Sequence, residues 1–294
     1  MKASREAPYL IKAGQYLREG ESQSGIFVSL CEIFWNRLLG LGHVFAPLRE
    51  SIKMPRKGAK KKESWPAFAG FDRMRGMMVN EVLSSEEQAR GWIGHALAPT
   101  ARQWDQLDRF AAMLIAENER QNLIAASTIP SLWVRHIADS AQLLALDAKR
   151  DGLWIDLGSG PGLPGLVVAI LSPRPMLLIE SRRRRCEFLR GVAADLDLTH
   201  VEVVEAPLER VETQPAATIS ARAFAPLDRL IALSTRFSTE STRWLLPKGR
   251  NAVKELALLP QPWQRMFHVE QSRTDAESRI LVGEGRIGAE QRGK

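Results

Sequence analysis

The sequence predicts an α/β fold in which a small helical region precedes a mostly parallel, doubly wound sheet with a closing antiparallel strand. Three observations support this prediction. Apolar residues recur at helical spacing before residue 150, short apolar runs alternate with helical stretches after Gly152, and a glycine-rich turn follows the first of those runs. Such alternation is typical of a parallel sheet that is covered by helices on both faces.

The helical region is predicted from its start signals and its apolar stripes. Ser84 with Glu87 and Thr100 with Gln103 fit capping boxes. A further helix is expected to begin near Pro130, because proline is favoured in a first turn. The apolar stripes consist of Trp104, Leu107, Ala111, Leu114 and Ile115, and of Trp133, Ile137, Ala141 and Leu144.

The alternating part of the chain predicts the sheet and its covering helices. Strands are expected at residues 153–157, 176–180, 201–205, 216–220 and 242–246. Helices are expected near residues 163–171, 182–195, 226–237 and 250–258. Two later apolar runs, 266–270 and 279–283, are expected to close the sheet as an antiparallel pair.

Positive charge is concentrated in the N-terminal quarter. Residues 1–75 hold 14 Lys and Arg against 7 Asp and Glu, whereas the rest of the chain holds 27 of each. Residues 1–78 are therefore interpreted as a basic extension, either disordered or translated from a start placed too early; a basic arm that grips RNA is the alternative. The helical region then covers residues 79–150, the α/β domain 151–285, and a flexible tail 286–294.

Cysteine use and hydropathy exclude several classes of protein. Cys31 and Cys186 form neither a disulfide framework nor a metal cluster, which is typical of a reducing cytoplasm. No run reaches the roughly 18 apolar residues of a membrane span. We therefore expect a cytoplasmic protein with no metal and no membrane partner. A monomer is also expected, although nothing in the sequence addresses the oligomeric state.

The strongest chemical signal is the turn Asp156-Leu157-Gly158-Ser159-Gly160-Pro161-Gly162-Leu163-Pro164-Gly165. A glycine-rich turn between a strand and a helix lets the backbone approach a ligand at the carboxyl end of the strand. Residues 160, 162 and 165 also fit the dinucleotide pattern G-x-G-x-x-G. However, an acid at Asp156 suits the ammonium group of S-adenosylmethionine better than a pyrophosphate. Glu180, at the end of the next strand, is placed to bind ribose hydroxyls.

Four motifs resemble the bacterial 16S ribosomal RNA 7-methylguanosine methyltransferase family, known as RsmG or GidB, over residues of about 84–284. The first is Asn122-Leu123-Ile124-Ala125 with Trp133-Val134-Arg135-His136-Ile137-Ala138-Asp139-Ser140, and the second is the glycine turn with its Leu163-Pro164-Gly165 ending. The third is Leu178-Ile179-Glu180-Ser181 with Arg182, Arg185, Phe188, Leu189 and Arg190. The fourth is Ser220-Ala221-Arg222-Ala223-Phe224-Ala225 followed by Lys248-Gly249.

The resemblance implies a class I, Rossmann-like, S-adenosylmethionine-dependent methyltransferase at residues 151–285. It implies methyl transfer to N7 of a guanosine in 16S ribosomal RNA, or in the small subunit that contains it. The cofactor-binding residues expected from the turn and the resemblance together are Asp156, Gly158, Gly160, Gly162, Leu163, Glu180, Leu208, Glu209 and Arg222. The family often has Asp where this chain has Glu180, and it usually has Ile-Ser-Arg-Ala where this chain has Ser220-Ala221-Arg222-Ala223.

The catalytic residues stay unassigned, because guanine N7 carries a free lone pair and needs no general base. Arg222, Arg135 and His136 are candidates for positioning the substrate. Candidate RNA contacts are Arg135, His136, Arg182, Arg185, Lys248 and Arg250. The alternatives to RNA contact are a purely structural role for His136 and a solvent-exposed start of the arginine-rich helix.

Other functions also fit parts of the sequence. The alternatives are a methyltransferase of the same fold that acts on another RNA, a protein or a small molecule, a dinucleotide-dependent oxidoreductase, and an RNA-binding protein without catalysis.

Overall fold

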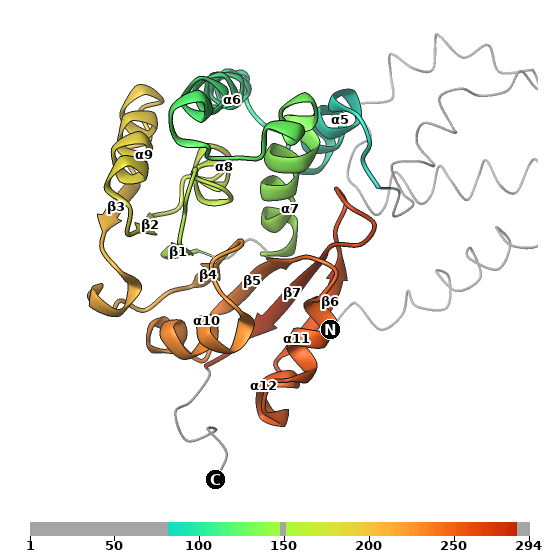
Figure 1. The fold of residues 1–294 in the computed structure, drawn as a ribbon, viewed down its shortest axis with the longest axis vertical. Coiled ribbons are helices and arrows are strands. Elements are labelled where there is room, and N and C mark those ends of the chain that lie inside the picture. The colour runs from blue at the N-terminus through green and yellow to red at the C-terminus, as the bar shows by residue number, and fades with distance from the viewer. Residues whose placement is uncertain (1–81, 148–150, 287–294) are drawn as a thin grey trace, which may run out of the picture. The chain divides into compact units, whose positions relative to one another are not determined.

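The fold is described for residues 82–147 and 151–286 of a computed structural model (Figure 1). These residues all belong to one unit, residues 68–294. The predicted extension 1–78 and the tail beyond residue 286 lie outside the described residues.

A helical region precedes the sheet, as predicted. It consists of α5 (Glu86–Leu97), α6 (Ala101–Gln121), the 3-10 helix η2 (Ala126–Ser131), the π-helical segment η3 (Trp133–Ala138) and α7 (Asp139–Leu146). Pro130 lies inside η2 rather than at the start of a helix. The π-helical segment is notable because such segments are rare and often occur at functional sites.

One capping prediction is confirmed and the other is wrong by one residue. Thr100 and Gln103 form both bonds of the box that begins α6. The cap of α5 is Ser85, whose Oγ accepts from the backbone N–H of Gln88, whereas Ser84 bonds the side chain of Gln88. The stripe of α6 also differs from the prediction: Phe110 is buried and Ile115, at the edge of the stripe, is exposed.

The sheet has seven strands in the order β3-β2-β1-β4-β5-β7-β6. Strands β1 to β5 are parallel, and β7 is antiparallel to both β5 and β6. The strands are β1 (Trp154–Leu157), β2 (Met176–Glu180), β3 (Val201–Glu205), β4 (Thr218–Ser220), β5 (Arg243–Lys248), β6 (Phe267–Gln271) and β7 (Arg279–Glu284). The predicted fold class is confirmed, and each predicted strand lies within two residues of the observed one.

Helices cover both faces of this sheet (Figure 1). The sheet-side helices are α8 (Gly165–Leu171), α9 (Arg183–Asp195), η4 (Leu208–Arg210), α10 (Leu227–Ser234), η5 (Thr235–Phe237), α11 (Ala252–Ala257) and α12 (Gln261–Gln264). Alternate residues of β1 face opposite sides: Trp154 packs with α6 to α9 in one hydrophobic core, and Ile155 packs with α10 and α11 in the other. The helical region thus shares a core with the sheet.

The chain reverses its direction of travel across the sheet at β1. Strand β2 lies on one side of β1 and β4 lies on the other. In open α/β sheets a ligand binds in the crevice at the carboxyl ends of the strands where this reversal occurs. The segments that follow β1, β2 and β4 are therefore brought to one site.

Candidate functional site

The glycine turn after β1 has the backbone conformation that its sequence predicts. Gly158 and Gly160 have φ values of 65° and 53°, in the left-handed region that favours glycine. A Cβ at Gly158 would lie 2.3 Å from Cδ2 of Phe224, in the segment after β4. A Cβ at Gly160 would have no neighbour nearer than 3.7 Å, so this side of the turn has room for a ligand. The peptide bond between Leu163 and Pro164 is cis.

Glu180 holds the turn from the end of β2. Its Oε2 accepts from the backbone N–H of Gly160 at 3.0 Å, and its Oε1 accepts from Ser181 and Arg182 at 2.8 and 2.9 Å. The guanidinium of Arg185 lies 3.8 Å from the carboxylate, which is only 6% exposed. The carboxylate is thus fixed at the edge of the turn, where one lone pair of Oε2 remains for a ligand.

Asp156 is directed into the protein and away from the open face of the turn. Its Oδ2 accepts from the backbone N–H of Gly165 at 3.2 Å, and its Oδ1 accepts from the Ser220 hydroxyl at 2.6 Å. Ser220 in turn accepts from the indole of Trp154 at 2.8 Å. Burial raises the pKa of Asp156 to about 6, although these hydrogen bonds oppose the rise. Asp156 therefore shapes the turn, and contact with the ammonium group stays a prediction.

His136 and Arg222, two of the candidates for positioning the substrate, meet beside this site. Arg222 Nη2 lies 2.8 Å from His136 Nδ1, and Thr128 Oγ1 lies 2.7 Å from His136 Nε2. Desolvation, together with the charges of Arg222 and Arg135, lowers the pKa of His136 to about 4. The ring is 5% exposed and both of its nitrogens are occupied, so its proposed RNA contact is indirect in this arrangement.

Asp139 joins this pair to the turn between β6 and β7. Its Oδ2 lies 3.1 Å from Arg222 Nη1, and its Oδ1 accepts from Thr274 at 2.6 Å. Arg135, on the neighbouring helical turn, forms an ion pair with Asp275 at 2.6 Å, which lowers the pKa of Asp275. The segments around residues 136, 222 and 274 are consequently linked, although they are distant in the sequence.

The four consecutive arginines at 182–185 do not share one partner. Arg182 precedes α9 and uses its backbone N–H on Glu180, while Arg185 faces the same carboxylate with its side chain. Arg183 pairs with Glu187 at 2.9 Å on the exposed side of the helix. Cys186 is fully buried, and burial raises the pKa of its thiol to about 11. Cys186 is therefore an apolar packing residue of the core.

The remaining candidates differ in their availability. Lys248 is bound within the protein, to Glu255 Oε2 at 2.9 Å and to the carbonyl of Ala225 at 3.1 Å, and its side chain is 11% exposed. Arg250 is 76% exposed and pairs with Glu277, which is also exposed. Leu208 and Glu209 lie in η4, where Leu208 is buried and Glu209 is exposed.

Sequence reasoning named Ser220 only as a member of a motif, without a role in the site, and it missed Thr128 and Thr274. Ser220 is opposite Asp156 in the register of β1 and β4, and Thr128 and Thr274 bond His136 and Asp139. A hydroxyl at the end of the strand paired with the acidic strand could have indicated Ser220. No local signal marks the two threonines, since their partners come from other segments.

The residues present fit S-adenosylmethionine as the methyl donor. The open face at Gly160, the fixed carboxylate of Glu180 and the crevice beside β1 provide a backbone cradle with an acceptor for ribose hydroxyls. A Rossmann-like sheet with an antiparallel closing pair and this site define an S-adenosylmethionine-dependent methyltransferase of class I.

Comparisons with known proteins identify the family. The chain matches the GidB family, described as rRNA small subunit methyltransferase G, over residues 103–280. It is 78% identical over 215 residues to the "Ribosomal RNA small subunit methyltransferase G" of Sphingopyxis alaskensis, covering 73% of this chain and 92% of that protein. It is 49% identical over 206 residues to the protein of the same name from Erythrobacter litoralis, covering 70% of this chain and 99% of that protein. The chain belongs to the rRNA small subunit methyltransferase G family.

A solved structure shows a weaker likeness. It is the E81Q mutant of MtNAS in complex with S-adenosylmethionine, 16% identical, with a TM-score of 0.43 over 69% of this chain and 84% of that one. A likeness at this level adds nothing to the assignment.

Within residues 82–147 and 151–286, no three His, Cys, Asp or Glu side chains lie together in a way that could hold a metal ion. In the same part of the chain, no helix is both long and apolar enough to cross a membrane.

Proposed function

We propose that this enzyme transfers the methyl group of S-adenosylmethionine to N7 of a guanosine in the 16S RNA of the small ribosomal subunit. The observation that carries this proposal is the 78% identity to a protein named for methylation of small-subunit ribosomal RNA. The choice of guanine N7 comes from the sequence resemblance and from the chemistry of the site.

The site is suited to a nucleophile that needs no deprotonation. Asp156 accepts from Ser220 and Gly165, and His136 is held between Arg222 and Thr128. Guanine N7 attacks with its own lone pair, so the protein needs to supply orientation rather than a base. A cysteine nucleophile, which methylation at carbon 5 of a pyrimidine requires, is not provided by Cys186, because burial raises its pKa to about 11.

The cofactor would be held by the turn and the two neighbouring strand ends. When bound, S-adenosylmethionine supplies a methyl group on a positively charged sulfonium. Glu180 would accept a hydrogen bond from the ribose, as its place at the end of β2 suits. Asp156 would keep the turn in shape. The other residues proposed to surround the cofactor are Gly158, Gly160, Gly162, Leu163, Leu208, Glu209 and Arg222.

The RNA would approach across the rim of charged side chains at the same edge. Arg135, Arg182 and Arg250 are exposed there and could contact phosphates, which would position the RNA without reading its sequence. Lys248 and His136 are proposed to act through the segments that they fix. We propose that the enzyme works as a monomer.

The test is to map modified nucleosides in small-subunit RNA by mass spectrometry, from cells with and without this gene. The expected result is the loss of a single 7-methylguanosine, which returns when purified protein and labelled S-adenosylmethionine are added to the unmethylated subunits. An unchanged modification map, with no label incorporated, would exclude this function.

A further inference from the structure

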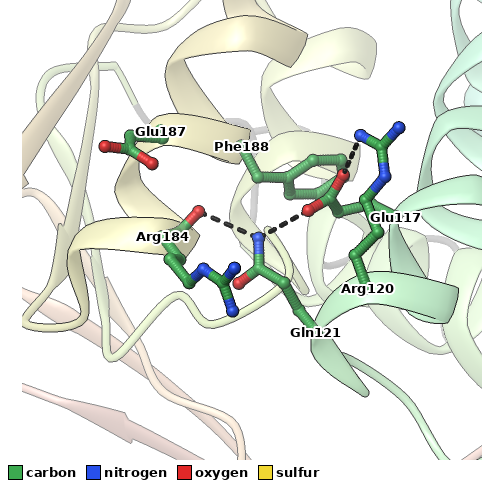
Figure 2. A pocket seen from close by; sticks show the side chains of 6 residues that line it. All are labelled: Glu117, Arg120, Gln121, Arg184, Glu187 and Phe188. Carbon is green, nitrogen blue, oxygen red and sulfur yellow. Dashed lines mark hydrogen bonds and ion pairs between the residues drawn. The ribbon is translucent and has the colours of Figure 1, made fainter.

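A pocket lies between the C-terminal end of α6 and the first two turns of α9, outside the cofactor site. Its volume is about 360 Å³, within the range of small-ligand sites. Figure 2 shows its walls, which are Glu117, Arg120 and Gln121 from α6 and Arg184, Glu187 and Phe188 from α9. Gln121 links the two helices at the pocket by donating to the backbone carbonyl of Arg184 at 3.0 Å.

The charges of this pocket are unequally satisfied. Glu117 accepts from Gln121 at 2.7 Å and pairs with Arg120 at 3.4 Å. Glu187 pairs with Arg183 at 2.9 Å. Within the described residues, the Arg184 guanidinium has no ion pair or hydrogen bond. The pocket therefore holds two neutralised carboxylates and one cation that is available to a ligand.

Phe188 adds an aromatic surface beside Arg184. Phe188 lies one turn further along the helix, on the same side as Arg184 (Figure 2), and is half-buried against the hydrophobic core. The pocket thus offers a cation and an aromatic surface about 6 Å apart along the helix axis.

We propose that this pocket binds one unpaired nucleotide of the RNA substrate, separate from the target guanosine. Its phosphate contacts Arg184, and its base lies against Phe188. Unpaired bases stack on aromatic side chains in this way, and phosphates pair with arginine. This inference rests on the proposed function. It gives two neighbouring arginines different roles, because Arg185 faces the Glu180 carboxylate and Arg184 faces the RNA.

The test compares two pocket variants with one control. Arg184→Ala removes the phosphate contact, and Phe188→Leu retains apolar packing but removes the stacking surface. Arg102→Ala is the control, because Arg102 is 68% exposed at the opposite end of α6 and its loss changes the charge equally. Binding of protein-free 16S RNA is measured over a range of salt concentrations. Methyl transfer to that RNA and to small subunits is measured separately.

We expect Arg184→Ala to weaken RNA binding about tenfold and to reduce the slope of log affinity against log salt by about one, since one phosphate contact is lost. Phe188→Leu should weaken binding about fivefold without changing that slope. Affinity for S-adenosylmethionine should be unchanged in both variants, and Arg102→Ala should behave as the wild type.

Three outcomes separate the possible failures. If wild-type enzyme methylates RNA and both pocket variants bind it normally, the pocket proposal is wrong and the proposed function stands. If the variants lose activity on small subunits but bind protein-free RNA normally, the pocket contacts a ribosomal protein, and the proposal is wrong. If wild-type enzyme methylates neither substrate, the proposed function fails and this inference fails with it.

Discussion

Arg222 Nη2 donates to His136 Nδ1 across 2.8 Å, and this single bond fixes the tautomer of the imidazole. Because a guanidinium has no acceptor, Nδ1 must carry a lone pair, and the ring proton must lie on Nε2, facing Thr128 Oγ1. The Thr128 hydroxyl then donates to the carbonyl of Ala125 at 2.7 Å. A neutral histidine therefore orients the arginine that follows β4.

Replacing His136 should reduce activity through Arg222. His136→Ala removes the acceptor of Nη2, so we expect kcat to fall about tenfold or more while the dissociation constant of S-adenosylmethionine changes less. His136→Asn, which can accept from Arg222, should recover part of the loss. Steady-state kinetics and isothermal titration check this expectation. Equal kcat for the alanine variant and the wild type would show that the arginine needs no such support.

Stability should depend on pH through His136. Its pKa falls from 6.5 to about 4 on folding, so between these values the unfolded chain binds more protons than the folded one. The stability from the neutral ring is complete above pH 6.5 and is lost as pH falls toward 4, at a slope approaching about 1.4 kcal/mol per pH unit. The difference in unfolding free energy between wild type and His136→Asn, measured in urea from pH 7.5 to 5, should shrink at low pH.

Asp156 provides the matched comparison, because folding raises its pKa whereas folding lowers the pKa of His136. Its pKa rises from 3.8 to about 6, so the folded state binds the proton more tightly, and this contribution is lost as pH rises through 6. The difference between wild type and Asp156→Asn should therefore shrink toward higher pH. Both differences moving in the same direction would show that one of the two assignments is wrong.

Glu180 should be essential for cofactor binding. Glu180→Gln cannot accept from the N–H groups of Gly160, Ser181 and Arg182 at once, because one of the two carboxylate oxygens is replaced by an NH2 group, which donates. We expect affinity for S-adenosylmethionine to fall at least tenfold in isothermal titration. Glu187→Gln, on the exposed side of α9, is the control and should bind normally. Normal binding by Glu180→Gln would remove this residue from the site.

Gly158 should tolerate no side chain. Gly158→Ala forces a Cβ to within 2.3 Å of the Phe224 ring and places alanine at positive φ, so we expect a loss of about 1–3 kcal/mol of stability and of detectable cofactor binding. Gly191→Ala, in α9 with no atom within 4 Å of the added Cβ, should be stabilising by about 0.5–1 kcal/mol. Thermal unfolding with and without S-adenosylmethionine measures both effects.

Replacing Lys248 and replacing Arg250 should affect stability and RNA binding differently, although the two residues are close in the sequence. Lys248→Ala releases the segment after β4 from α11, so we expect a loss of about 1–2 kcal/mol of stability. Arg250→Ala breaks only an exposed ion pair and should cost less than about 0.5 kcal/mol, while weakening RNA binding at low salt. The reverse pattern of unfolding and binding data would contradict the structural role of Lys248.

The strands, the glycine turn and the acidic residue at the end of β2 could be predicted because their signals are local. Short apolar runs indicate β1 and β2, and ten consecutive residues are enough to indicate the turn between β1 and α8. The class of the fold followed from the same alternation. The 3-10 and π-helical segments around Pro130 could not be predicted, because ordinary helical spacing describes them equally well.

The partners of the site residues depend on pairings between distant segments. His136 meets Arg222 from 86 residues away, and Asp156 meets Ser220 only because β1 and β4 pair in that register. The sequence places Lys248 in a basic rim that could contact RNA. In the structure its ammonium group is bound by Glu255 of the following helix instead. A list of charges along a chain does not show which of them are already neutralised.

The hold of Glu180 on three backbone amides has a kinetic consequence. A loop that is ordered during folding has little conformational entropy left to lose when its ligand arrives. The cofactor should then bind without a conformational change of the turn, at a rate set mainly by diffusion and orientation.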